Sequence, residues 1–277
     1  MSKPGLVIAI DKPRQWSSFQ VVNKLKWHIK REFGLKKFKI GHAGTLDPLA
    51  SGLLLVCVGA ATKQIDVLQS GHKLYTGTMV LGATTPCYDL ERPIDHYYPY
   101  SHITADKLQE ACQRFVGPIE QVPPMFSAVK IGGQRAYVSA RDGQPVAIEP
   151  KTVVIDSIKV TAFRSGDGSM LPPLNETDSQ DAPSRNLYKD PLGVVPSALP
   201  QFDFSIACGK GTYIRSIARD LGEALGSGAF LSALRREQIG EYTLRDAIGI
   251  DDIERTITKD NPTYQVLREL QPNTTAQ

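Results

Sequence analysis

Apolar residues in this chain occur in two patterns, continuous short runs and helical spacings. Continuous apolar runs predict strands at residues 6–10, 53–58 and 74–81. Apolar residues at helical spacing predict helices around residues 22–29, at 60–68 and at 106–115. Ser17 or Ser18 can cap the first of these helices, and Gly117-Pro118 ends the third. The first 120 residues therefore predict a mixed α and β protein.

The second half of the chain continues this mixture around one irregular stretch. Residues 153–163 and 202–208 read as strands that would pair as a hairpin if joined directly. Between them, residues 165–200 contain six prolines in 36 residues, which predicts an inserted, poorly ordered loop of unknown role. We expect one catalytic domain over residues 1–250, with this insertion, and a short C-terminal tail over 251–277.

Composition and charge narrow the class of protein. The chain has 277 residues, 41% of them hydrophobic, which suffices for a proper core. It has no apolar run long enough to span a membrane and no secretory signal, so we expect a cytoplasmic protein. The four cysteines lie far apart without a CxxC pair, and the five histidines have no metal-ligand spacing.

Positive charge is concentrated at the N-terminus. Residues 1–63 carry 11 Lys and Arg against 3 Asp and Glu, whereas the rest carries 21 against 26. A basic region that includes Lys36, Lys37 and Lys39 suits a polyanion. A solvated basic helix face is the competing interpretation.

The stretch Gly41–Lys63, GHAGTLDPLASGLLLVCVGAATK, carries the candidate chemistry. Its single carboxylate, Asp47, stands between glycine-marked turns and directly before the most apolar run in the protein. Pro48 disfavours helical backbone at Asp47, so the chain there is expected to be extended or turning. A carboxylate on a stiff loop is held still and stays accessible. The competing interpretation is that Asp47 only starts a turn.

This stretch resembles the catalytic motif of the TruB-type tRNA pseudouridine-55 synthases. The other motifs that carry the resemblance follow in order: Lys73-Leu74-Tyr75 before Leu81-Gly82, then Pro123–Lys130 (PPMFSAVK), then Lys210–Arg215 (KGTYIR) with Asp220-Leu221-Gly222. The segment from Asp11 to Ser18 also resembles the family, except that Gln15 stands where a glycine is usual. The resemblance covers about residues 5–250.

The resemblance implies catalytic roles for three residues. Asp47 is the essential carboxylate, which attacks C1′ or removes the C2′ proton. Arg215 faces Asp47 and keeps it ionised and oriented, because a guanidinium fork matches a carboxylate. Tyr75 stacks on the flipped base. From the pattern alone, a strand tyrosine is more often a core residue.

The resemblance also implies RNA contacts. His42 is a candidate to fill the stack that the extruded nucleotide leaves, with a structural histidine as the alternative. Lys130 belongs to a projecting RNA-clamping region over residues 123–143. Leu234 packs against the target base or belongs to the core. Lys210 lies in a Gly-rich strand-to-helix turn that is able to hold a phosphate, although the spacing is not that of a P-loop.

The implied fold is α+β, a long mixed or antiparallel sheet with flanking helices and a central RNA-binding cleft. The 27 residues after 250 are too few for the PUA-type domain that many members carry, so we expect none. The expected protein is a monomer that needs neither cofactor nor metal and modifies uridine 55 in the T-arm loop of tRNA. A non-catalytic RNA-binding protein and a glycosidase are the alternatives. The second normally requires two carboxylates.

Overall fold

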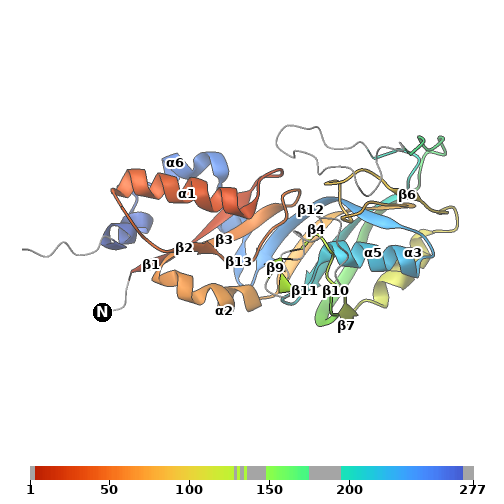
Figure 1. Cartoon of the computed structure of the whole chain (residues 1–277), viewed down its shortest axis with the longest axis horizontal. Coiled ribbons are helices and arrows are strands. Elements are labelled where there is room, and N and C mark those ends of the chain that lie inside the picture. Colours follow the sequence, from red (N-terminus) through yellow and green to blue (C-terminus); the bar gives the residue numbers. More distant parts are fainter. Residues whose placement is uncertain (1–3, 128–129, 132–133, 136–147, 175–194, 271–277) are drawn as a thin grey trace, which may run out of the picture. The chain divides into compact units, whose positions relative to one another are not determined.

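The computed structural model describes residues 4–127, 130–131, 134–135, 148–174 and 195–270 (Figure 1). The chain divides into two compact units. Unit 1 comprises residues 1–73 and 235–277, and unit 2 comprises residues 74–234. Strand β12 (Ala229–Ile239) gives its first residues to unit 2 and its last residues to unit 1.

Unit 1 is built on a mixed sheet with the strand order β14-β1-β3-β12. Strand β2 adds to β3, and β13 adds to β12. β1 pairs antiparallel with β3, whereas β12 pairs parallel with β3 and β14 pairs parallel with β1. The bounds of the unit 1 strands are Gly5–Lys12 (β1), Ile40–His42 (β2), Ser51–Gly59 (β3), Tyr242–Thr243 (β13) and Ile248–Gly249 (β14).

Both faces of this sheet are covered, which explains why β3 is a continuous apolar run. Ile8, Ile10 and Leu54 belong to the core on one face, and Ala9 and Leu55 belong to the core on the other. This division follows from the alternation of side chains along a strand.

Helices complete unit 1. Helix α1 (Ser18–Phe33) packs on the first face together with the C-terminal segments, and helix α2 lies on the opposite side of the sheet (Figure 1). Ser17 caps α1 and forms a capping box with Gln20, as expected for one of the two candidate serines. The remaining helical elements are η1 (Ala60–Gln64), α2 (Ile65–Ser70), η3 (Leu244–Asp246), η4 (Ile250–Asp252), α6 (Ile253–Thr256) and η5 (Pro262–Leu270).

Unit 2 is also a sheet with helices, in the strand order β12-β4-β11-β10-β7. β10 and β11 form the antiparallel pair predicted from the sequence, with register shifts at Ile155/Ser157 and Val160/Ala162. Its larger elements are β4 (Lys73–Leu81), α3 (Ala105–Gln113), β7 (Gly117–Gln121), β10 (Lys151–Arg164), β11 (Gln201–Cys208) and α5 (Ile214–Ala224). Two small hairpins pair β5 (Ala83–Thr84) with β6 (His96–Tyr97) and β8 (Lys130–Ile131) with β9 (Gln134–Arg135).

Two features depart from simple sequence reasoning. Gln15 has a φ of 67°, a left-handed conformation that glycine adopts without strain. A residue with a Cβ is strained in this conformation, so Gln15 occupies a turn position that suits glycine. Residues expected to form only a short tail bury Ile253, Ile257, Tyr264 and Leu267 in the core of unit 1.

Among the described residues, no helix has the length and apolar character needed to cross a membrane.

Candidate functional site

Asp47 lies on the loop that connects β2 to β3 in unit 1, and neighbouring elements hold this loop by its backbone. Ser18 both donates to the carbonyl of Leu46 and accepts from its amide, each at 2.9 Å. The amide of Gln15 donates to the carbonyl of Pro48 at 2.8 Å. The contacts fix the backbone on both sides of Asp47, as the interpretation of a stiff loop predicts.

Arg236, from the unit 1 end of β12, adds a second set of contacts to the same loop. Its guanidinium is buried, with 1% of the residue exposed. It donates to the carbonyls of Leu53 at 2.8 Å, Gly44 at 3.2 Å and Thr45 at 3.3 Å. One side chain thus joins the two ends of the Asp47 loop. We call these three hydrogen bonds the Arg236 clamp.

Gly52 makes the clamp possible because the backbones of β3 and β12 approach closely there. A Cβ added at Gly52 would lie 2.3 Å from the carbonyl oxygen of Arg236, and the residue has a φ of 104°. Both facts require glycine. The glycine that marks the end of the loop in the sequence is therefore a packing requirement of the strand pair.

Lys12, at the end of β1, places a buried amine beside the loop. Its Nζ donates to the carbonyls of Trp16 at 2.6 Å, Pro13 at 3.0 Å and Pro48 at 3.3 Å. Burial lowers the pKa of Lys12 to about 7, opposed by the negative charge of Asp47 and reinforced by the positive charge of Arg236. Asp47 therefore stands among charged groups of its own unit.

His42 ends β2 and is half-buried. Burial and then the charge of Arg236 lower its pKa, against a backbone hydrogen bond at Gly44 that raises it. The imidazole is consequently neutral at neutral pH. A neutral ring suits the predicted stacking role better than a contact with phosphate, and that role stays a prediction.

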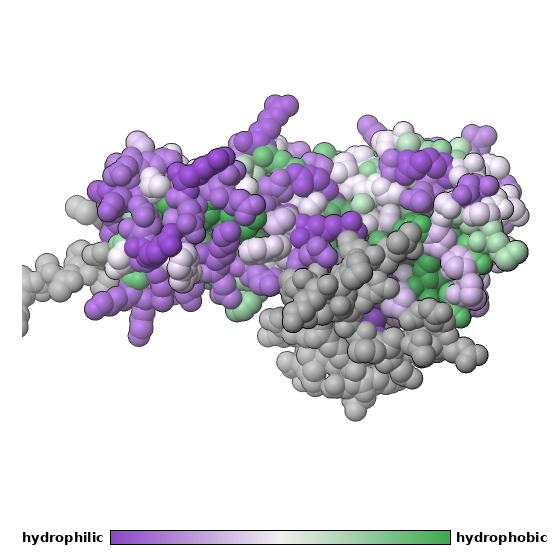
Figure 2. Space-filling view, turned by 90° about the horizontal axis from the view of Figure 1, so that it is seen from above, coloured by the Kyte–Doolittle hydropathy of each residue, from purple (hydrophilic) through white to green (hydrophobic). Residues whose placement is uncertain are grey.

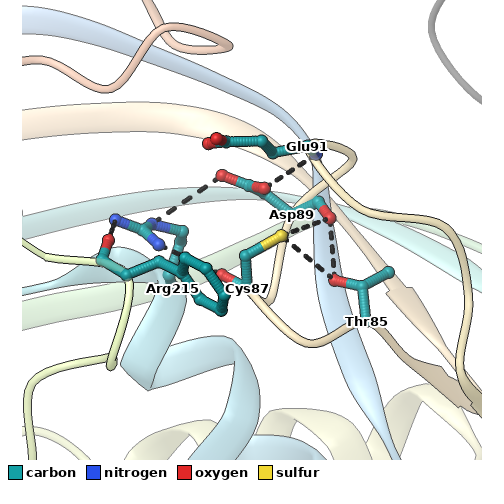
Figure 3. A network of polar contacts seen from close by, with 6 residues as sticks. Thr85, Cys87, Asp89, Glu91 and Arg215 are labelled. Atoms are coloured by element: carbon teal, nitrogen blue, oxygen red, sulfur yellow. Dashed lines mark hydrogen bonds and ion pairs between the residues drawn. The ribbon is translucent and has the colours of Figure 1, made fainter. Parts of the chain in front are cut away.

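Arg215 lies in the first turn of α5, at the centre of a buried polar network in unit 2 (Figure 3). Its guanidinium lies 3.8 Å from the carboxylate of Asp89 and donates to the carbonyls of Cys87 at 3.1 Å and Phe126 at 2.9 Å. Thr85 and Cys87 in turn donate to the carbonyl of Asp89. Arg215 is thus rigidly held within its unit.

The loop around Asp89 is itself fixed. Asp89 forms an isolated parallel β-bridge with Leu231 of β12. Its carboxylate accepts a hydrogen bond from the amide of Glu91 (Figure 3). Burial, followed by the charge of Asp89, raises the pKa of the Cys87 thiol well above its ordinary value, so this cysteine stays protonated. The carboxylate that pairs with Arg215 inside unit 2 is therefore Asp89. The expected contact between Arg215 and Asp47 stays a prediction.

The other predicted site residues occupy varied positions. Tyr75 lies on β4 and is 9% exposed. Leu234 lies on β12 and is half-buried, whereas Lys210 is exposed in the turn after β11. Lys130 begins β8, and its side chain lies outside the described residues, as do residues 128–129, 132–133 and 136–143 of the projecting region.

Sequence reasoning missed Lys12, Asp89 and Arg236. For Lys12 a signal existed, because strand alternation places it on the same face as Ile8 and Ile10. Arg236 and Asp89 gave no local signal, because their partners lie far away in the sequence.

The fold of this chain is similar to that of a solved protein. The solved structure "Crystal Structure of a Cbf5-Nop10-Gar1 Complex" contains a chain that matches 96% of this chain with a TM-score of 0.58 and 26% identity. This chain spans 59% of that solved chain. The profile of the "TruB family pseudouridylate synthase (N terminal domain)" matches residues 30–171, and the profile of the "tRNA pseudouridylate synthase B C-terminal domain" matches residues 215–275. These matches define the class as pseudouridylate synthases.

Curated relatives give the family within this class. A "tRNA pseudouridine synthase B" of Phocaeicola vulgatus is 44% identical over 90% of this chain and 92% of its own length. Another of that name, from Flavobacterium johnsoniae, is 45% identical over 91% of this chain and 96% of its own length. The chain belongs to the TruB family of tRNA pseudouridine synthases.

Proposed function

We propose that this chain converts uridine 55 in the T-arm loop of tRNA to pseudouridine, with Asp47 as the essential carboxylate. The family is one of isomerases, and the relatives named tRNA pseudouridine synthase B match the chain over nearly its whole length. The observation that carries the role of Asp47 is its loop, which Ser18, Gln15 and Arg236 hold by the backbone. A reacting group fixed in this way needs little reorganisation in the transition state.

The reaction breaks the bond between C1′ and N1 of the uridine and forms a bond between C1′ and C5. C5 loses its proton and N1 takes up one, so the product is an isomer of the substrate. Asp47 acts either as a nucleophile at C1′ or as a base at C2′. Replacing the hydrogen at C2′ by deuterium distinguishes the two routes. The rate should fall only if Asp47 acts as a base, because only that route breaks the bond between C2′ and its hydrogen.

Tyr75 and Arg215 complete the proposed catalytic set. The Arg215 network keeps a planar cation in one orientation inside unit 2, which suits a carboxylate or an anionic group of the substrate. Tyr75 offers an aromatic face for the extruded base. His42, Leu234, Lys210 and Lys130 are the proposed RNA contacts.

The test uses purified protein and an unmodified tRNA transcript, with a chelator and no added cofactor. We expect pseudouridine at position 55 and none in a matched transcript with cytidine at that position. Binding of the transcript without any conversion over a long incubation with excess enzyme would contradict the proposal and favour an RNA-binding protein. Conversion at another position would refute the assignment to the T arm.

A further inference from the structure

Five lysines of unit 1 surround one hollow of the surface. The hollow has a volume of about 390 Å³ and is lined by Lys26, Lys30, Lys36, Lys37, Phe38 and Lys39. We call it the lysine pocket. Four of these lysines are exposed and Lys26 is half-buried, so the ammonium groups reach solvent. The side of unit 1 on which α1 lies is largely hydrophilic (Figure 2).

The local fold forces these lysines together. Lys26 and Lys30 are one helical turn apart and lie on the same side of α1. Gly34 ends the helix in a left-handed conformation with a φ of 65°, and its amide bonds back to the carbonyl of Lys30. The chain therefore reverses, and residues 36–39 return alongside the last turns of α1. Buried Phe33 and Leu35 anchor this reversal in the core.

No carboxylate of the part of the chain that the structure describes compensates the charges in the pocket. Among the described residues, none of the five ammonium groups forms an ion pair with a carboxylate. Neighbouring cations on α1 do so, since Lys24 pairs with Asp251 at 3.8 Å and Arg31 pairs with Glu254 at 3.1 Å. Glu32, the acidic residue of α1, accepts a hydrogen bond from the amide of Lys259.

The helix dipole of α1 does not neutralise the lysine pocket. The carboxyl end of a helix carries about half a negative charge, which balances at most half of one lysine. About four and a half positive charges then remain around one concavity, where they repel each other until an anion binds.

The pocket is also close to Asp47 along the chain. Lys39 directly precedes β2, and the loop after β2 carries Asp47. Eight residues span at most about 28 Å when fully extended. Stacked nucleotides rise about 3.4 Å each along one strand, so this limit corresponds to about eight nucleotides.

We propose that the lysine pocket binds consecutive phosphates of the RNA backbone, within about eight nucleotides of the uridine that reaches Asp47. The proposal rests on the function proposed above and adds a binding site that sets the salt dependence and the register of the RNA. Lysine suits this task because its point charge contacts phosphate without selecting a base.

The experiment measures affinity for the T-arm hairpin and for whole tRNA across a salt series. The variants are Lys26→Gln with Lys30→Gln, and Lys36→Gln with Lys37→Gln and Lys39→Gln. Glutamine keeps a polar chain of good helix propensity. The matched control is Lys107→Gln with Lys159→Gln, two exposed lysines of unit 2.

Each lost phosphate contact should reduce the slope of log affinity against log salt by about 0.7 to 0.9. We therefore expect the double variant to lose about 1.5 in slope with both RNAs, and the control to keep the wild-type slope. A wild-type slope in both pocket variants would overturn the proposal.

One further readout separates other outcomes. Inorganic tripolyphosphate, titrated by calorimetry, tests for a free polyphosphate ligand. An alternative outcome is that tripolyphosphate binds the wild type but not the pocket variants, while the salt dependence of tRNA affinity stays the same in all of them. This result would show that the pocket binds a free anion and would refute the proposal that it binds RNA. If the slopes fall as expected but the wild type forms no pseudouridine, the pocket stands and the proposed function fails.

Discussion

The variant Arg236→Lys should still fold but should catalyse the reaction much more slowly than the wild type. The substitution keeps the buried positive charge but replaces a planar fork by a point donor. An ammonium at this position can reach the carbonyl of Leu53 or those of Gly44 and Thr45, but not both sides of the loop. The loop that carries Asp47 then loses its connection to β12.

The magnitude follows from the lost hydrogen bonds. A hydrogen bond from a charged donor contributes about 1.5 to 3 kcal/mol. Gly44 is half-buried and Thr45 is exposed, so water can replace part of the two lost contacts. We expect a loss of about 2 kcal/mol in the free energy of unfolding. A displacement of about 1 Å in a reacting group costs on the order of a hundredfold in rate. We therefore expect kcat to fall about a hundredfold, with the Kd for tRNA nearly unchanged.

Urea unfolding, tRNA binding and single-turnover conversion are measured on the same preparation, with Arg245→Lys, an exposed arginine of unit 1, as control. Arg236→Met gives an independent readout, because removal of the charge should raise the pKa of His42, which NMR titration follows. A variant Arg236→Lys that is destabilised but converts tRNA at the wild-type rate would refute the positioning role. An unchanged pKa of His42 in Arg236→Met would refute the electrostatic part.

Three further predictions follow from single residues. Gln15→Gly should raise the free energy of unfolding by about 0.5 to 1 kcal/mol in urea unfolding, because glycine adopts the left-handed backbone conformation without strain. Equal stabilisation by Gln15→Ala would contradict this explanation, because alanine keeps a Cβ. The pKa of Lys12 is lowered on folding, from an ordinary value of 10.5 to about 7. Between pH 7 and pH 10.5 the unfolded chain therefore binds one more proton at Lys12 than the folded chain does. In this range the free energy of unfolding of the wild type, relative to that of Lys12→Met, should rise by up to about 1.4 kcal/mol per pH unit. Urea unfolding at pH 6 to 9 measures this difference, and a difference independent of pH would refute the prediction. Arg215→Lys should fold but lose most activity in single-turnover assays, because an ammonium cannot keep the contacts to the carboxylate of Asp89 and two carbonyls; wild-type turnover would exclude the guanidinium from catalysis.

Much of the fold could be predicted from the sequence because its signals are local. The run before Asp11 and the run 53–58 are strands, and Ser17 caps α1 as a short-range motif predicts. The β10 and β11 hairpin was also predictable, since alternating residues mark both strands. These features depend on neighbours in the sequence and on strand or helix periodicity.

The support of the site could not be predicted in the same way. Glycine and proline chemistry marks the Asp47 loop, but the Arg236 clamp joins residues 191 positions apart through a parallel strand pair. Asp89 meets Arg215 across the buried network of unit 2, where no spacing rule connects them. The packing of Ile253, Ile257 and Leu267 in the same core as the buried face of α1 likewise depends on where the chain returns.

The central claim is that the carboxylate of Asp47 performs the chemistry, and Asp47→Asn tests it most directly. Asparagine has nearly the same size but lacks the charge and basicity of the carboxylate. The control is Asp66→Asn, an exposed carboxylate on α2 in the same unit. Two quantities are measured on one preparation: tRNA affinity by filter retention, and pseudouridine formed over a long incubation with excess enzyme. We predict wild-type affinity and no detectable pseudouridine for Asp47→Asn, whereas slow but complete conversion would mean that the catalytic group lies elsewhere.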